Sequence, residues 1–511
     1  MSDRSVILSS SFVAAERSPR AERLRRSARS TVAYGALLAV VFLGAVIGVR
    51  TPLLLFGSVA VIAFVLLAWA RPKLALALTV IVTMISPQLQ AAMGSVGGIA
   101  DEAMIFGAAT VIVARRALVE RSVVWLPGLG WFGLFVFAGT LGAIVYGTPL
   151  EISLQGATLL VKCVVIAIAV SQVHWSPSDL HGLARAGFVL ALILIVTGLV
   201  NLAIPGPWAG LLAGSAVQYV GGVPSIIGPF QQPAAYGRMA TILASSILAY
   251  QLFVKSSWVG YLTALLLGGL SLLTFRVKAL VGLLLVSTGL VLRAGNALIL
   301  AVLAACLPAV LALVGPGIFT AVFGDVELYY GEGQTSARSR LTAGGTQLAM
   351  SHFPLGVGFG RYASATAADY YSPEYTRLGF DRIYGLGSKP GFGKYLNDTQ
   401  WPALLGETGW LGTIAFIIGA ILTLRILLQR TAPDEPPIVR WIRLSGVCWF
   451  VLIMLDSVAA PAFTSPPSYL FLFAGAAIVA SLRFDLREGI LRFGESRLDH
   501  TQSTQQRNKA S

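Results

Sequence analysis

The sequence predicts an all-α polytopic membrane protein with about fourteen transmembrane helices, on three observations. Of its 511 residues, 56% are hydrophobic and 12% are charged, and this charged fraction is about half that of an average soluble protein. The apolar residues gather in runs close to the roughly 20 residues that a bilayer-spanning helix needs. Lys and Arg lie mainly between these runs, as in the cytoplasmic loops of membrane proteins.

The apolar runs set the expected spans. In chain order these are 31–49, 52–70, 73–87, 101–118, 125–146, 154–173, 180–203, 234–254, 258–275, 278–293, 296–320, 401–427, 441–461 and 467–483. Residues 324–400 form a far longer connection, which we call the large polar loop and expect to carry short helices. The segments 1–30 and 484–511 are polar tails on either side of the transmembrane domain, 31–483.

Short connections rich in Lys and Arg alternate with connections that hold neither, and this alternation sets the orientation. The basic connections contain Arg71, Lys73, Arg115, Arg116, Arg121, Lys255, Arg293, Arg425, Arg430, Arg440, Arg443 and Arg483. The basic first 30 residues show no secretory cleavage site, so a retained cytoplasmic tail is expected. With an even number of spans, both termini are cytoplasmic and the large polar loop is extracytoplasmic, outside the cytoplasmic (inner) membrane.

Other residue types limit the class of chemistry. The net charge of +14 is explained by cytoplasmic anchoring in the membrane, so no nucleic-acid partner is expected. The three cysteines lie within apolar runs and the four histidines show no ligand spacing. Neither a disulfide framework, a metal site nor a cofactor is therefore predicted. The absence of a Ser or Cys nucleophile pattern favours metal-free group transfer.

The large polar loop concentrates ionisable residues and holds eight of the fifteen tyrosines. Ionisable groups are costly inside hydrocarbon, so a membrane protein carries its chemistry where they gather. Connections longer than about 12–15 residues are usually functional or disordered, and the aromatic content of this one disfavours disorder. We therefore expect the site of any enzyme activity in this loop and in the stretch 397–412 that follows it.

Apart from Arg50 in a tight hairpin, three cations outside the large polar loop break the charge pattern, because they lie at the extracytoplasmic ends of expected spans. Arg238 opens the eighth span, and Arg276 and Lys278 lie between the ninth and the tenth. Such cations either extend toward lipid phosphate or hold an anionic group presented at the outer leaflet. The second interpretation is favoured for Arg276 and Lys278 together, and neither is favoured for Arg238.

Arginine presents a planar fork of donors that matches phosphate oxygens, and lysine adds a compact charge. Cations beside a large outer loop suit a polyprenyl-linked diphosphate, and they would stabilise the charge of the departing diphosphate. The candidate diphosphate ligands are Arg276, Lys278, Arg338, Arg340, Arg238 and Arg361. The candidate glycan contacts are Tyr362, Tyr395 and Trp401. Their rings offer apolar faces to sugars, although an interfacial aromatic belt also explains some of them.

Glycosyl transfer also needs a base that takes a proton from the acceptor hydroxyl. Asp398 and Glu407 are the carboxylates nearest the exit of the loop into the membrane, and on a helix they would point in different directions. Asp398 is either the base or the N-cap of the twelfth span, where Asn397 or Thr399 would also serve. Glu407 is either a functional intramembrane acid or a hydrogen-bonding cap for a neighbouring loop.

Three stretches between roughly residues 220 and 425 resemble the O-antigen ligase and polysaccharide polymerase family. LLTFRVKALVGLLL is similar to the family's segment in which a Ser-Arg pair precedes a small-residue helix, with Phe275 in place of Ser. ARSRLTAGGTQLAMSHFPLGVGFGRY resembles its arginine-bearing loop helix, followed by P-x-G-x-G-x-G and an aromatic residue. NDTQWPALLGETGWLG is similar to its H-N-x-x-x-x-x-L-x-E-x-G-x-x-G pattern, with Asp398 where ligases carry His.

The resemblance implies a glycosyltransferase that moves a glycan from undecaprenyl diphosphate to a hydroxyl of a glycan or lipid acceptor, with inversion and without a metal. It implies that Arg276 and either Arg338 or Arg340 bind the diphosphate. A carboxylate beside several arginines is expected to have a lowered pKa. Asp398 in place of His therefore favours a polymerase, or a related surface-glycan transferase, over a ligase.

Two alternatives stand beside this interpretation. The peptidoglycan polymerases of the shape, elongation, division and sporulation family also use an outer-loop carboxylate, but they usually have fewer spans and lack the P-x-G-x-G-x-G stretch. A transporter or flippase of lipid-linked glycans would hold ionisable groups at the membrane midplane, where Lys162 and Asp456 are candidates. The concentration of charge at the outer surface favours the transferase.

Overall fold

The computed structural model describes residues 52–212, 217–220, 222–296, 337–389, 393 and 395–491. The expected span 31–49, nearly all of 296–320, the tail 1–30 and most of the tail 484–511 lie outside these ranges. So do residues 324–336 of the large polar loop. The chain divides into two units, Met1–Ala70 and Arg71–Ser511. Helix α2 (Pro52–Ala70) belongs to the first unit, and all the other described helices and strands belong to the second.

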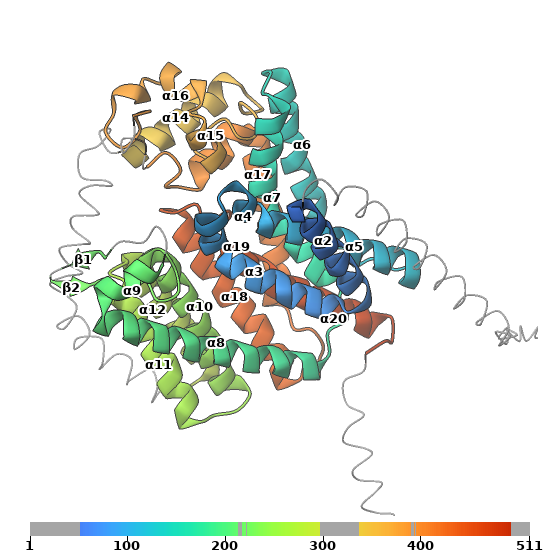
Figure 1. Ribbon diagram of the computed structural model, residues 1–511. Helices are drawn as coiled ribbons and strands as arrows, with labels where there is room; N and C mark the ends of the chain where they lie inside the picture. The colour runs from blue at the N-terminus through green and yellow to red at the C-terminus, as the bar shows by residue number, and fades with distance from the viewer. Residues whose placement is uncertain are drawn as a thin grey trace, which may run out of the picture. The chain divides into compact units, whose positions relative to one another are not determined.

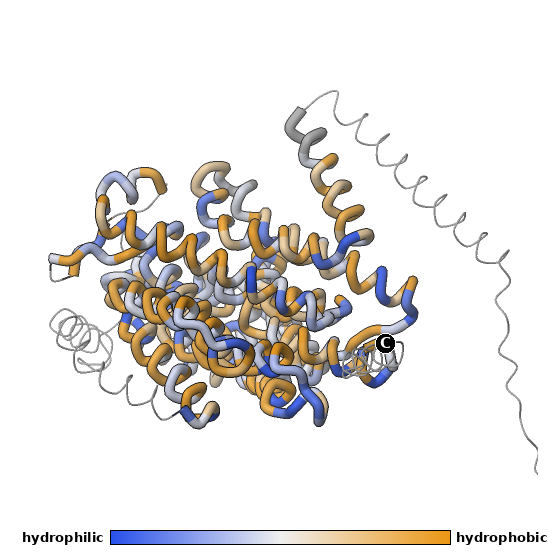
Figure 2. Tube along the Cα trace, turned by 90° about the horizontal axis from the view of Figure 1, so that it is seen from below, coloured by the Kyte–Doolittle hydropathy of each residue, from blue (hydrophilic) through white to orange (hydrophobic). Residues whose placement is uncertain are grey.

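The described part of the chain is mostly helical. Seven helices are long and apolar enough to cross a membrane: α3 (Pro72–Met93), α7 (Leu150–Ser171), α8 (Pro177–Ala203), α12 (Val277–Ala294), α17 (Trp401–Leu428), α18 (Pro437–Ser457) and the continuous stretch of α19 (Tyr469–Leu472) and α20 (Ala474–Arg487). Figure 2 shows apolar residues along most of the helices and hydrophilic residues mainly at their ends. These helices support the predicted all-α membrane class, whereas the number of fourteen spans and the orientation stay predictions.

The remaining helices also follow the expected spans. They are α5 (Ala100–Arg115) with the π-helix η1 (Arg116–Glu120), α6 (Leu129–Val145), α10 (Pro233–Phe253) and α11 (Trp258–Leu272), with short helices α4 (Ser95–Gly98) and α9 (Pro205–Leu211) between spans. One small hairpin, β1 (Tyr219–Val220) with β2 (Val223–Pro224), is the strand structure of the described residues. Every expected span within the described ranges is therefore helical.

Two groups of helices pack around α17 and α18 (Figure 1). Helix α10 packs against α8, α11, α12 and α18, and its buried face joins a cluster that includes Tyr236 and Leu243 of α10 and Leu270 of α11. Helix α17 packs against α6, and α5 against α7. The large polar loop contributes α14 (Ala337–Ser351), α15 (Ala365–Asp369), α16 (Pro373–Arg377) and η4 (Phe380–Arg382), as expected. Helix α14 packs on α17, so the loop rests on the helix that follows it.

The large polar loop has an apolar core of its own. Tyr362, Tyr375 and Phe380 are buried within it, and Leu341 of α14 and Ala403 of α17 belong to the same cluster. Aromatic side chains bury large areas and therefore stabilise compact structure. The tyrosines that made this loop unusual in the sequence serve in part to fold it.

The glycine-rich stretch 354–360 fastens the loop to a break in α17. Gly409 has φ +65° and ψ −167°, a conformation that essentially only glycine adopts. Beside this break, the Val357 N–H donates to the Gly406 carbonyl and the Gly358 N–H to the Glu407 carbonyl, each at 2.9 Å. A Cβ at Gly356 would lie 2.3 Å from the Gly406 carbonyl oxygen. Glycines on both segments therefore permit backbone contact that side chains would prevent.

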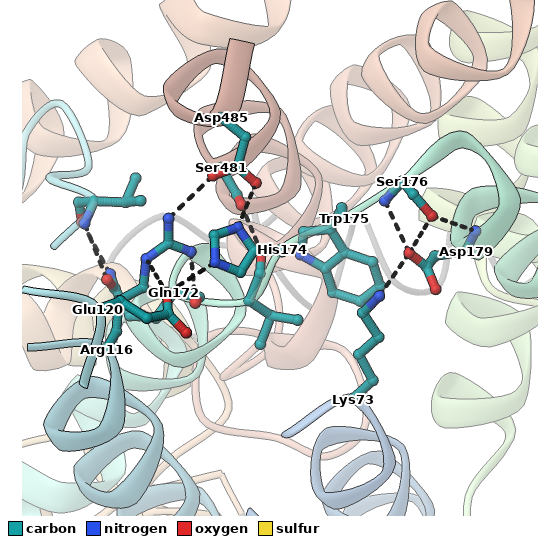
Figure 3. A network of polar contacts seen from close by, with 12 residues as sticks. Lys73, Arg116, Glu120, Gln172, His174, Trp175, Ser176, Asp179, Ser481 and Asp485 are labelled. Carbon is teal, nitrogen blue, oxygen red and sulfur yellow. Dashed lines mark hydrogen bonds and ion pairs between the residues drawn. The ribbon is translucent and has the colours of Figure 1, made fainter. Parts of the chain in front are cut away.

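A separate polar network fixes the connection between α7 and α8 (Figure 3). The buried Arg116 pairs with Asp485 of α20 at 3.1 Å and donates to the Gln172 carbonyl at 2.7 Å. The ring nitrogens of His174 lie 2.8 Å from Asp485 and 2.8 Å from Glu120. The hydrogen bond with Asp485 raises the pKa of His174. The network ties η1, the α7–α8 connection and α20 together.

Substituting Gly409→Ala should destabilise the protein, because the added Cβ would meet the Leu355 carbonyl carbon at 2.2 Å in a backbone conformation that alanine disfavours. Strain of this kind costs about 1–3 kcal/mol. The thermal unfolding midpoint of the purified protein in detergent checks this. Gly133→Ala in α6 is the matched control, since a Cβ there meets nothing within 4 Å. Equal midpoints for the two variants would contradict the role assigned to the break.

Candidate functional site

Asp456 lies between two of the cations that the sequence singled out. Its carboxylate is 3.1 Å from Arg238 Nη1 and 2.7 Å from Lys278 Nζ. The Asp456 side chain is only 5% exposed. Lys278 also donates to the Ala459 carbonyl at 2.9 Å, and Arg238 to Ser468 Oγ at 3.1 Å. Helices α10, α12 and α18, distant in sequence, thus meet through one carboxylate and two cations.

Arg276 stands at the beginning of α12, where it is the N-cap residue. The preceding Phe275 is buried and has φ +51°, a conformation that a bulky side chain rarely adopts. Arg276 Nη2 donates to Gln218 Oε1 at 3.1 Å. Its Nε is buried and has no hydrogen-bond partner within the described part of the chain. A buried donor of this kind needs a partner, which a water molecule or a ligand can supply.

These residues line one pocket, which we call the cation pocket: Arg238, Arg276, Lys278 and Asp456. Its other walls are mainly apolar and include Ile242, Leu452 and Ile453. The N-terminus of α12 carries a partial positive charge, and Arg276 and Lys278 add two full positive charges at the same place. That arrangement is unfavourable for an isolated helix and favourable for binding an anion.

The large polar loop contributes a second ion pair, between Arg338 and Asp398. Arg338 Nε donates to Asp398 Oδ2 at 2.8 Å, and Nη2 donates to the same oxygen. Asp398 Oδ1 forms no hydrogen bond with a described residue, and the side chain is 29% exposed. Gln400 is the N-cap of α17 and makes no side-chain cap. The alternative that Asp398, Asn397 or Thr399 serves as this N-cap is therefore wrong.

The ion pair lies beside the cation pocket. Lys278 and Arg276 are close enough to Asp398 to favour its ionised form, as Arg338 does. Arg338 and Lys278 are also close enough for their positive charges to repel each other. Burial nevertheless raises the pKa of Asp398 above its ordinary value, because loss of solvent outweighs these attractions. The expectation of a lowered pKa for Asp398 is thus wrong, although the neighbouring arginines do favour its ionised form.

The other candidate arginines lie in different surroundings. Arg340 is exposed on α14, two residues from Arg338 and so on another side of the helix. Arg361 is buried and pairs with Glu374, to which Arg377 also donates at 3.0 Å. The structure thus brings Arg338, but neither Arg340 nor Arg361, together with Asp398.

Glu407 is completely buried at the junction of the loop and α17. Its Oε1 accepts hydrogen bonds from the Tyr362 N–H at 3.1 Å and from Ser364 Oγ at 2.6 Å. Oε2 has no hydrogen-bond partner in the described residues. These contacts belong to the loop-holding alternative for Glu407, whereas a catalytic role stays a prediction.

The three aromatic candidates are partly or wholly packed into the protein. Tyr362 is buried, and its hydroxyl donates to the Leu341 carbonyl at 2.7 Å. Trp401 Nε1 donates to Ser457 Oγ at 3.0 Å, which joins α17 to α18. Tyr395 packs its ring where a Cβ of Gly385 would lie. Tyr362 therefore presents no open face to a glycan, and Trp401 and Tyr395 are half-buried.

The pairing of Asp456 with the cations was missed at the level of sequence. The one available signal was that an acid within an apolar span is costly and so marks a site by default. Among the described residues, no group of three or more His, Cys, Asp or Glu side chains is placed to hold a metal ion. No protein-family model matches the chain, and no curated protein matches it.

Substituting Asp456→Asn should destabilise the protein, because Arg238 and Lys278 lose a shared counter-charge in a mostly buried place. Breaking a buried ion pair from one side costs about 3 kcal/mol. Thermal unfolding of the purified protein measures the loss, and adding Lys278→Met to the same variant should recover much of it. The control is Asp381→Asn, which removes an exposed pair with Arg382. If Asp456→Asn were as stable as this control, Asp456 would not be the shared counter-charge of Arg238 and Lys278.

Proposed function

We propose that the protein is a membrane glycosyltransferase acting on a glycan linked to undecaprenyl diphosphate, at the outer face of the cytoplasmic membrane. The observation that carries the proposal is the convergence of Arg238, Arg276, Lys278 and Arg338 on one place beside Asp398. These residues come from α10, α12, α14 and the segment before α17.

Charge balance supports a diphosphate as the ligand. Among the described residues, the four cations are accompanied by two carboxylates, Asp398 and Asp456, which leaves two positive charges in excess. A diphosphate esterified at both ends carries two negative charges at neutral pH. The buried Nε of Arg276, which has no partner among the described residues, supplies a donor for a phosphate oxygen. The cation pocket encloses only about 20 Å³, room for about one water, so the diphosphate would lie at its mouth, where Arg276 is placed at the start of α12.

The proposed reaction is a single displacement at the anomeric carbon. Asp398 Oδ1 takes the proton of the acceptor hydroxyl while the hydroxyl oxygen forms a bond to this carbon. The bond from the carbon to the diphosphate oxygen breaks, and the electron pair leaves with the polyprenyl diphosphate. Attack from the opposite face inverts the configuration. Arg276 and Lys278 would stabilise the charge gained by the leaving group, and Arg338 would orient Asp398 through two hydrogen bonds to Oδ2.

The three stretches that resemble the O-antigen ligase and polysaccharide polymerase family give independent support. Their cations and acid are the residues that meet at the site, namely Arg276, Arg338 and Asp398. The preference for a polymerase over a ligase rests only on Asp398 replacing the His of ligases, since the lowered pKa expected for Asp398 is not found. Glu407 is assigned the positioning of the loop through Tyr362 and Ser364.

Transport of lipid-linked glycans is the second candidate, and one observation favours it. Lys162 is buried within the helices and lies 2.9 Å from Glu102 and 3.4 Å from Asp101. Tyr469 donates to Asp101 at 2.6 Å and lies under the Lys162 ammonium. A transporter would use such a group along its path. Lys162 is fully paired here, however, and is apart from the cation pocket, so transferase activity remains the better supported function.

Purified protein incubated with a lipid-diphosphate oligosaccharide should give lengthened glycan products. Arg276→Ala should lower the rate by about 10²–10³-fold, because it removes a donor that stabilises developing charge. Product length is read by gel or mass spectrometry. Arg382→Gln, on an exposed side chain of the same loop, is the control. Full polymer synthesis by Arg276→Ala would exclude the diphosphate role. One-step transfer to another molecule would indicate a ligase, and absence of transfer would favour transport.

The rate should also report the ionisation of Asp398. Because burial raises the pKa of this carboxyl, the ionised base is lost at a higher pH than for an ordinary aspartate of pKa about 3.9. A profile of kcat/KM against pH should therefore fall on its acid side, starting above this value. Asp398→Asn should lose about 10²-fold or more in kcat and lack this limb. A loss of only a few-fold would show that Asp398 is not the base.

A further inference from the structure

The large polar loop holds a second cavity, apart from the cation pocket. Its volume is about 310 Å³, at the lower end of the roughly 300–1,000 Å³ typical of small-molecule sites. We call it the loop cavity, with Leu396 and Gly387 at its buried floor, Tyr371 at its wall, and Asp369, Ser388 and Lys389 at its exposed rim. The proposed displacement uses none of these residues.

The wall of the loop cavity is rigidly held. The Tyr371 hydroxyl donates to the Leu386 carbonyl at 3.1 Å, and its ring centroid lies 5.3 Å from that of Tyr375 in the loop core. Tyr371 also has φ +49°. A tyrosine in this conformation is strained, and such strain gathers at functional sites. The ring is thus fixed as a flat surface beside a small apolar floor.

The rim carries a carboxylate, a hydroxyl and an ammonium group that have no partners in the described part of the chain. Asp369, Ser388 and Lys389 form no side-chain hydrogen bond or ion pair with any residue in the described ranges. A carboxylate only accepts hydrogen bonds, an ammonium only donates them, and a hydroxyl does both. A ligand rich in hydroxyl groups can satisfy all three, and aromatic rings pack well against the C–H faces of sugars.

The loop cavity adjoins the proposed base through the backbone. Leu396 precedes Asp398 by two residues, so their Cα atoms are at most about 7.6 Å apart. The Asp398 N–H donates to the Tyr395 carbonyl at 3.2 Å, which turns the chain between them. Leu396 also belongs to the same buried cluster as Tyr375 and Leu341 of α14, the helix that carries Arg338. A ligand in the loop cavity therefore lies within a few sugar lengths of Asp398.

We infer that the loop cavity is a saccharide-binding subsite that holds one or two sugar units near Asp398. Its relation to catalysis rests on the proposed function, while binding itself does not. Sugar units reach it either from the donor, whose diphosphate would occupy the cation pocket, or from the acceptor. Both sources present the same hydroxyl-rich chemistry.

Binding is tested with the oligosaccharide released by mild acid from the host's lipid-diphosphate pool, which carries neither lipid nor diphosphate. Saturation-transfer NMR on the full-length protein should show binding, and Asp369→Asn and Lys389→Gln should each weaken it about tenfold, as expected for one charge-assisted hydrogen bond. Asp434→Asn, exposed between α17 and α18, is the control and should bind as the wild type does. Absence of wild-type binding, or equal binding by all variants, would overturn the inference.

Kinetic measurements distinguish the donor glycan from the acceptor glycan as the ligand of the loop cavity. They also test the subsite separately from the proposed function. In the transfer assay, Asp369→Asn should raise KM about tenfold for the substrate whose glycan occupies the cavity, with kcat little changed. An increase in donor KM alone assigns the donor glycan, and one in acceptor KM alone assigns the acceptor. Saccharide binding without any transfer would leave the subsite standing and remove the proposed function. Normal transfer with unchanged KM in the variants would exclude the subsite and leave the proposed function standing.

Discussion

The arrangement of the site depends on one electrostatic constraint, which is the need to hold several cations together in a mostly apolar setting. Asp456 meets this need by pairing with both Arg238 and Lys278, and a buried charge left alone would cost several kcal/mol. Because one carboxylate serves two cations, the pocket stays positive overall. Helices α10, α12 and α18 are thereby held in a geometry that favours an anionic ligand.

The same site also requires that the large polar loop be fixed to the helices. Glycines on both segments let residues 354–360 pack on the backbone of α17 where Gly409 breaks it, and Glu407 binds the loop from the helix side. This attachment fixes α14 on α17 and places Arg338 against Asp398. The backbone contact between residues 354–360 and α17 therefore both stabilises the folded loop and brings Arg338 to Asp398.

Sequence reasoning reached the helices and the unusual cations because both signals are local. Arg276 and Lys278 stood out where a charge rule is broken. It did not separate Arg338 from Arg340, since only the docking of α14 decides which side of that helix meets Asp398. It also gave Asp398 a lowered pKa, because neighbouring charges can be read from a sequence and burial cannot. The pairing of Asp456 depended in the same way on packing between distant helices.

The central claim is that the cation pocket binds a diphosphate, and a binding measurement tests it without any need for turnover. Purified protein is titrated with farnesyl diphosphate and with farnesol, which differ only in the charged group. The diphosphate should bind at least about 10²-fold more tightly, since two or more charge-assisted hydrogen bonds distinguish the two compounds. Equal affinity for the two compounds would contradict the central claim.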